Sequence, residues 1–427
     1  MLNRFVKTAQ FVNDVRTRFN PKHPILKSDG EWLKHRLQDM GPTYVKIGQF
    51  VSTRVDVFDK NIVTSLKELQ DRVRPVDDAL IKDLIRQGVD INNFKSIEKH
   101  PIASASIGQV HKAVLKNNKQ VVIKIKRPNI TETIKEDISI LLLILNAMEF
   151  CNVPNISESR ELVENFQAFV LQEADYANEV ANMDIFVSTN KNKTTILLPK
   201  IIKQYSTDEA IVMSYVPCTK FSELKSIMTL EERSKMAYNF MDIFVQQLIF
   251  DGVLHGDPHE GNVGYDVAAQ KFVIYDMGNI ITLDANLRML MKQFIFEIML
   301  ENLDNAIDVM KRIDLINIRD EARLRVYLEK YVEYIKTIDI KVFTMSDKEV
   351  FKSLPVKLDG VIFRLIRVFG LIEGICKDLD PNFNYNTVFM KYVDTLVMDQ
   401  DFIDYKIRSD LRSILGALIK GLDLKKK

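Results

Sequence analysis

The fold is decided by LHGDPHEGN, from Leu254 to Asn262, and by FVIYDMG, from Phe272 to Gly278. These neighbouring stretches contain Asp257, Asn262 and, at the end of an apolar strand, Asp276. Phosphoryl transfer needs hard oxygen ligands for magnesium and a further carboxylate near the attacking hydroxyl or water. One loop can carry Asp257 and Asn262 to the same cavity, and the following hairpin can return Asp276 to it. The combination predicts a phosphoryl-transfer site; the alternative is a set of polar residues that only satisfy turns.

A lysine in a strand is the second candidate. In QVVIKIKRP, from Gln120 to Pro128, alternation places Lys124 with Val122 on one face and Val121 with Ile123 on the other. A lysine held among branched neighbours in a strand can reach the α- and β-phosphates of a nucleotide. The alternative is an edge-strand lysine that blocks aggregation.

A loop of small residues precedes this strand. The stretch IASASIGQVHKA, from Ile102 to Ala113, occupies the place where a phosphate-covering loop is expected. Small side chains still allow the backbone to approach phosphate, but they restrict it more than glycine does. We therefore expect a loop stiffer than a glycine-rich one.

Two polar helical stretches complete the set of candidates. In QEADYANEVANM, from Gln172 to Met183, Glu173 is expected to pair with Lys124, although a solvated acidic helix face is the common alternative. In GPTYVKIGQFVSTR, from Gly41 to Arg54, Lys46 and Gln49 lie on one helix face. By pattern alone the second stretch is an amphipathic helix.

Composition and element order define the fold class. The chain has 427 residues and a net charge of +1, which gives no global field for nucleic acid. Three cysteines without a CxxC fit a reducing, intracellular compartment. The patterns predict a helical extension over 1–95, a small mixed-sheet lobe over 96–218 and a helical lobe over 219–427. We therefore predict an α+β, bilobal, protein-kinase-like fold with an N-terminal helical extension and a mostly helical C-lobe.

Taken together, these motifs resemble the UbiB family of aarF-domain atypical kinases. The resemblance runs from about Leu37 to Leu283 and rests on five ordered motifs: KIGQ at 46–49, the Ala/Ser loop at 103–109, IK at 123–124, EAD at 173–175, and HGDPHEGN with DMG. KxGQ and the alanine-rich loop are specific to that family among kinase-like proteins. The stretch LQDRVRP, from Leu69 to Pro75, also resembles its pattern.

The resemblance implies a role for each motif. Asp257 would be the catalytic-loop aspartate, Asn262 and Asp276 would hold Mg²⁺, and Lys124 would contact the nucleotide phosphates while paired with Glu173. The expected contacts of ATP are Ala103, Ser104, Ala105, Ser106, Ile107, Gly108, Val110, Val122, Lys124 and Met213. Lys46 and Gln49 would lie on a helix folded across the site, meet the acidic motif that includes Asp175, and block a protein substrate.

The family is associated with ATPase activity stimulated by membrane lipid and with isoprenoid quinone (ubiquinone) metabolism. A membrane surface is therefore an expected partner, and nucleic acid is not. The basic segment 1–30 fits either a membrane-surface arm or an organelle-targeting segment, such as a mitochondrial one. The C-terminal stretch 409–427 fits either packing on its own domain or lying on a membrane.

Several positions depart from the family pattern. Glu260 stands where the family has proline, Met277 replaces the phenylalanine of DFG, Val122 replaces a small residue, and Ser214 replaces an acidic hinge residue. None of these changes removes a metal or phosphate ligand, so activity remains the expectation. Two alternatives stay open: a non-catalytic nucleotide-binding scaffold, and a small-molecule kinase of the aminoglycoside or choline kinase type.

Overall fold

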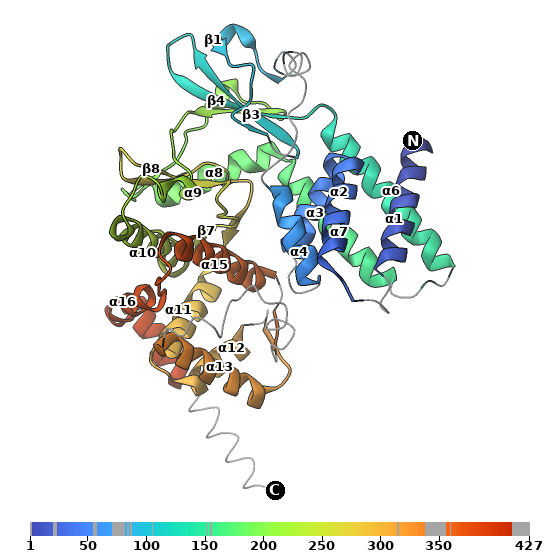
Figure 1. Ribbon diagram of the computed structural model, residues 1–427. Helices are drawn as coiled ribbons and strands as arrows, with labels where there is room; N and C mark the ends of the chain where they lie inside the picture. The colour runs from blue at the N-terminus through green and yellow to red at the C-terminus, as the bar shows by residue number, and fades with distance from the viewer. Residues whose placement is uncertain are drawn as a thin grey trace. The chain divides into compact units, whose positions relative to one another are not determined.

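The computed structural model divides into two compact units (Figure 1). It describes residues 2–19, 24–53, 58–70, 82, 85, 88–104, 106–151, 153, 156–313, 316–337, 356–358 and 360–411. Among these, the first unit contains the residues up to 218 together with 263–279. The second unit contains 219–262 and the described residues from 280 onward.

An antiparallel sheet forms the centre of the first unit. Its path is β1 (Phe94–Ile97), β3 (Gly108–Leu115), β4 (Gln120–Lys126) and β6 (Ala210–Ser214), and the short β2 (Ala103–Ser104) also pairs with β3. The predicted alternation in β4 is confirmed, because Val121, Ile123 and Ile125 are buried in one core with Phe94 and Val212. The face that carries Lys124 lies opposite this core.

Helices make up the N-terminal part of the first unit. They are α1 (Leu2–Arg18), α2 (Lys27–Met40), α3 (Pro42–Thr53) and α4 (Lys60–Lys67), with one turn of 3₁₀ helix at Glu68–Gln70. Their shared core includes Tyr44, Leu37 and Leu66. α3 begins at Pro42, since proline suits the first helical turn. A Cβ on Gly48 would come within 3 Å of methyl carbons of Leu69 and Leu37, so these side chains would have to shift to admit one.

The acidic segment consists of two helices rather than one. After α6 (Ile130–Phe150), α7 ends at Glu173 (Ile156–Glu173) and α8 begins at Tyr176 (Tyr176–Asn190). Asp175 is the N-cap of α8, and its carboxylate accepts a hydrogen bond from the Asn178 backbone nitrogen at 3.0 Å. The predicted single helix over 172–183 is therefore wrong, because a capping aspartate starts a new helix there.

A second, three-stranded sheet also belongs to the first unit. It orders β5 (Ile196–Leu197), β9 (Lys271–Ile274) and β8 (Val263–Asp266), with β8 and β9 forming the predicted hairpin. Asp276 follows β9 directly. The hairpin therefore returns this carboxylate to the unit that contains Lys124.

The second unit is mostly helical, as predicted. Its elements are α9 (Phe221–Leu224), α10 (Leu230–Gln246), a π-turn at Gln247–Asp251, β7 (Val253–His255), β10 (Ile280–Thr282), α11 (Ala285–Met299), α12 (Leu303–Arg312), β11 (Ile316–Ile318), α13 (Glu321–Thr337), β12 (Val356–Leu358), α15 (Gly360–Leu379), α16 (Asn386–Val397) and a final helix over 400–411. The β11–β12 ribbon was not predicted. β7 pairs with β10, and the loop with Asp257 follows β7.

Three predicted features fall wholly or partly outside the described residues. These are Ala105, the LQDRVRP stretch beyond residue 70, and the C-terminal stretch beyond residue 411. Across the helices that the structure does describe, none has the length and hydropathy needed to span a bilayer.

Candidate active site

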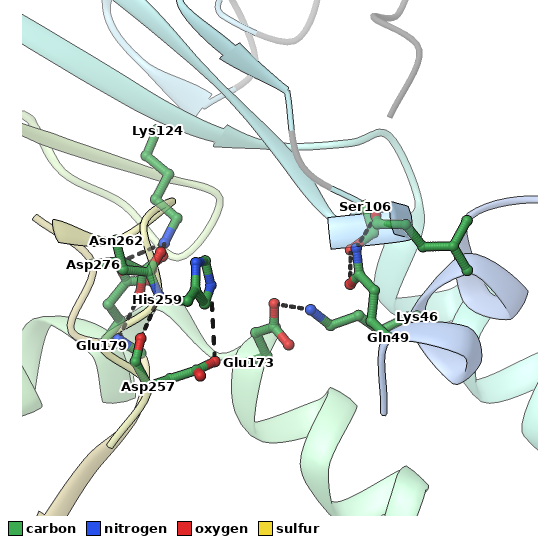
Figure 2. A network of polar contacts seen from close by, with 12 residues as sticks. Lys46, Gln49, Ser106, Lys124, Glu173, Glu179, Asp257, His259, Asn262 and Asp276 are labelled. Atoms are coloured by element: carbon green, nitrogen blue, oxygen red, sulfur yellow. Dashed lines mark hydrogen bonds and ion pairs between the residues drawn. The ribbon is translucent and has the colours of Figure 1, made fainter. Parts of the chain in front are cut away.

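Lys124 lies between two carboxylates in the first unit (Figure 2). Its ammonium donates to both carboxylate oxygens of Glu179 at 2.7 Å and to Oδ2 of Asp276 at 2.9 Å. Burial alone would lower the pKa of Lys124, but Asp276 and Glu179 outweigh it and raise the pKa well above its usual value. The lysine is therefore positively charged and fixed from two different elements, α8 and the segment after β9.

Glu179 is the acid that pairs with Lys124, and the prediction of Glu173 for this role is wrong. Glu173 lies at the end of α7 and pairs with Lys46 of α3 instead. The reason is the helix break at Ala174 and Asp175, which separates Glu173 from the helix that faces β4.

A sequence signal for Glu179 was present. Tyr176, Glu179, Met183 and Phe186 lie at spacings of three and four residues, and all of them are buried on one face of α8. An acid on an otherwise apolar helix face needs a buried cation as a partner. Recognising the start of the helix at Asp175 would have identified it.

Asp276 is held by backbone and side-chain bonds at once. Its Oδ1 accepts a hydrogen bond from the Gly278 backbone nitrogen at 2.9 Å, while Oδ2 accepts from Lys124. Met277 is fully buried, so it occupies an apolar pocket as expected of a replacement for phenylalanine. The Asp276 side chain itself stays partly exposed, so its carboxylate is accessible to a ligand.

In the second unit, the loop after β7 is organised around Asp257. Arg367 of α15 donates from Nη2 to Asp257 Oδ1 at 2.7 Å. Burial would raise the pKa of Asp257, but Arg367 and His259 outweigh it, and the pKa lies below its usual value. Sequence reasoning missed Arg367 because the pair is separated by 110 residues. No local pattern signals such a contact.

Histidines and Asn262 fix the backbone of the same loop. The Asp257 backbone nitrogen donates to His255 Nδ1 at 3.2 Å, and the Gly261 backbone nitrogen donates to His259 Nδ1 at 2.9 Å. Asn262 donates from Nδ2 to the Asp257 carbonyl at 3.1 Å. Because this bond uses the amide nitrogen, the amide oxygen is the atom of Asn262 that can act as a metal ligand.

The donor set fits magnesium better than a softer metal. Asp276 offers a carboxylate and Asn262 an amide oxygen, both hard ligands. Nowhere in the described part of the chain do three or more His, Cys, Asp or Glu side chains form a metal-binding group. The two residues belong to different units, and at either one phosphate and water would supply the remaining oxygens of a magnesium ion.

The small-residue loop is bonded to several elements of the first unit. Ser106 donates to the Gln49 amide oxygen at 3.4 Å, and Gln49 donates to the Leu69 carbonyl at 2.8 Å. Arg127 donates to Ser104 at 3.2 Å. The loop is therefore tied to α3 through Gln49, whereas the expected contact with the acidic motif is made by Lys46 with Glu173.

Most of the other residues expected to contact the nucleotide lie in the sheet of the first unit, and one of them lies in a hydrophobic core. Val110 pairs with Lys124 across β3 and β4, and Val122 pairs with Met213 across β4 and β6. Ala103 lies in β2 and is exposed. Ile107 differs, because its side chain is buried in a core with residues of α3, α6 and α7. Only the backbone of Ile107 is available to a ligand.

Comparisons with known proteins define the family. A family model described as the ABC1 atypical kinase-like domain matches residues 68–310. The chain therefore belongs to the ABC1 atypical kinase-like family, and UbiB-named proteins are among its relatives. The resemblance inferred from the motifs is confirmed.

Individual relatives are distant. The protein named "ACTIVITY OF BC1 COMPLEX KINASE 8, chloroplastic" from Arabidopsis thaliana is 26% identical over 90% of this chain and 56% of its own length. A probable protein kinase UbiB from Cellvibrio japonicus is 32% identical over 55% of this chain and 44% of its own length. The chain thus spans about half the length of these two relatives.

A solved structure supports the fold. The structure of the Rv3197–erythromycin complex from Mycobacterium tuberculosis matches with a TM-score of 0.58 and 21% identity, over 78% of this chain and 87% of that chain. At this identity the match shows a shared fold alone. The predicted α+β, bilobal, kinase-like fold is confirmed.

Proposed function

We propose that the protein binds ATP with Mg²⁺ and either hydrolyses it or transfers its terminal phosphoryl group. The observation that carries this proposal is the buried Lys124 ammonium held between Glu179 and Asp276. A fixed cation beside a partly exposed carboxylate supplies one group for phosphate and one for metal. Lys34 and Lys406 also pair with two acids each, so the distinguishing feature at Lys124 is the partly exposed Asp276 carboxylate that directly follows β9.

Each residue has a separate task in this proposal. Lys124 binds the α- and β-phosphates, and Glu179 keeps its ammonium in place when Asp276 turns to the metal. Asp276 and Asn262 bind Mg²⁺, which neutralises charge on the phosphate oxygens when bound. Asp257 orients the attacking hydroxyl or water, and Arg367 fixes the direction of its carboxylate.

The proposed acceptor is water or a small lipid-like molecule at a membrane surface, rather than a protein. The contact between Lys46 of α3 and Glu173 supports a helix that covers the acidic segment of the first unit. A role in isoprenoid quinone or related lipid metabolism rests on the resemblance to the UbiB family. The scaffold and the small-molecule kinase remain the alternatives that the experiment separates.

The test is hydrolysis and binding of ATP by the purified full chain with Mg²⁺, with and without vesicles of anionic phospholipid. Asp276→Asn and Asp257→Asn remove one negative charge each. Asp266→Asn is the matched control. Asp266 lies in the β8–β9 hairpin that precedes Asp276, and its carboxylate accepts hydrogen bonds from the backbone of the hairpin turn. We expect hydrolysis in the wild type and the control, and its loss in the two site variants.

Other outcomes identify the alternatives. Binding of ATP without release or transfer of phosphate under any condition would favour the scaffold and remove the catalytic role of Asp257. Turnover that depends on an added aminoglycoside or choline would favour the small-molecule kinase. Absence of ATP binding to the folded protein would overturn the proposal.

A further inference from the structure

Tyr176 carries a hydroxyl group that is buried within the first unit. It is the first residue of α8 and is 1% exposed. None of the described residues gives or receives a hydrogen bond at its hydroxyl oxygen. A buried polar group left without a hydrogen-bond partner lowers the stability of the folded state. Phenylalanine would fill the same space without this cost, so the hydroxyl needs an explanation.

The hydroxyl lies beside the end of the small-residue loop. A Cβ on Gly108 would come to 2.5 Å from the Tyr176 hydroxyl oxygen and to 2.8 Å from the Ile125 carbonyl. Gly108 is therefore required partly because the phenol approaches it. Small residues here were expected to let the backbone approach phosphate; at position 108 the glycine also leaves room for a protein side chain.

The same side chain faces the charged side of the sheet. Gly108 pairs with Lys126, and Val110 pairs with Lys124, so these positions share one face of β3 and β4. The Lys124 and Lys126 ammoniums lie 5.4 and 5.1 Å from the centre of the Tyr176 ring. Tyr176 thus packs against the face of β3 and β4 that carries Gly108 and the two cations.

The surroundings make the hydroxyl a donor. Burial raises the pKa of Tyr176 above its usual value, so the phenol keeps its proton. Lysine ammoniums are donors and cannot accept this proton. Glu179, whose carboxylate oxygens accept from Lys124, does not accept a hydrogen bond from the Tyr176 hydroxyl. An acceptor that suits this donor is an anionic oxygen bound beside the two lysines.

We propose that the Tyr176 hydroxyl donates a hydrogen bond to a phosphate oxygen of the bound nucleotide, beside Gly108. This inference rests on the proposed binding of ATP and adds a residue to it. In this family member the loop has few glycines, and the phenol supplies a phosphate donor that the backbone of a glycine-rich loop would otherwise give. The stability lost in the free protein is recovered when the nucleotide binds.

The test is Tyr176→Phe, which removes one oxygen atom. We expect the apparent melting temperature of the nucleotide-free protein to rise by about 2 °C, because an unpartnered buried hydroxyl is lost. We also expect the dissociation constant for MgATP, measured by calorimetry, to rise about tenfold or more, because a hydrogen bond to a charged oxygen is lost.

Tyr44→Phe is the matched control. Tyr44 is also fully buried in the first unit, but its hydroxyl is bonded to Thr8 at 2.6 Å. This control should lower the melting temperature and leave the affinity for MgATP unchanged.

The outcomes separate the two proposals. If the wild type does not bind MgATP, the proposed function fails. If the wild type binds and Tyr176→Phe binds equally well, only the role of Tyr176 fails. A lower melting temperature for nucleotide-free Tyr176→Phe would also overturn this role, because the hydroxyl would then have a partner in the free protein.

Discussion

Two lysines of the first unit meet the acidic segment 173–179, and they do so in different ways. Lys46 pairs with Glu173, and its ammonium lies 5.5 Å from the centre of the Phe169 ring. Lys124 has an aromatic neighbour too, in Tyr176, but it pairs with two carboxylates. A lysine with one acid fastens two elements together. At Lys124, buried Glu179 can keep the ammonium in place while the more exposed Asp276 turns to a metal or a phosphate.

The largest expected effect compares the two lysines directly. Lys124→Met should lower ATP hydrolysis by about 100-fold or more, because it removes the cation that would bind the phosphates. Lys46→Met should change hydrolysis by less than about tenfold, because its ammonium is engaged with Glu173. Steady-state rates and circular dichroism of both variants check this. Equal losses in two folded variants would contradict the difference between the lysines.

The two acids offer the next comparison. Glu179→Gln should lower kcat by about 10–100-fold, since Lys124 loses the partner that holds it in place. Glu173→Gln should lower kcat by no more than about threefold. Both changes conserve size, so each is a control for the other. A larger loss for Glu173→Gln would restore the pairing predicted from the sequence.

The sequence predicted those parts of the site that depend on local patterns. Lys124 follows from strand alternation, and Asp276 follows from the apolar strand before it. The partners could not be assigned in this way. Glu179 was missed because one capping residue, Asp175, divides the acidic segment into two helices. Arg367 was missed because only the folded chain brings α15 to the loop with Asp257.

The fold, like the site, has features that follow from local sequence patterns and features that do not. The hairpin of β3 and β4, the start of α3 at Pro42 and the helical character of the second unit all come from periodicity and turn residues. The β11–β12 ribbon joins two strands of three residues each, which are too short to show a period.

The pH dependence of stability gives a third test of the cluster formed by Lys124, Glu179 and Asp276. Burial and the nearby Asp276 raise the pKa of Glu179 from 4.5 to about 7, although Lys124 opposes this. The folded state therefore holds a proton on Glu179 to higher pH than the unfolded chain does. Raising the pH from about 4.5 to 7 favours the unfolded chain at this position.

Denaturant unfolding of the wild type and of Glu179→Gln, without metal or nucleotide, measures this contribution. The unfolding free energy of the wild type should fall relative to the variant across this range, by up to about 3 kcal/mol. Parallel pH profiles for the two proteins would mean that Lys124 balances the burial of Glu179 completely. The presence of Asp276 beside Glu179 would then not destabilise the folded protein.

The smallest expected effect is the coupling between Lys46 and Glu173. The Glu173 side chain is 31% exposed and that of Lys46 is 9% exposed, so water screens the pair on one side. A double-mutant cycle with Lys46→Met and Glu173→Gln should give a coupling of about 0.5–1 kcal/mol in unfolding free energy. A coupling above about 3 kcal/mol would make this pair comparable to a fully buried one. Lys46 would then be a rigid part of the fold, and α3 could not move away from the acidic segment without unfolding the first unit.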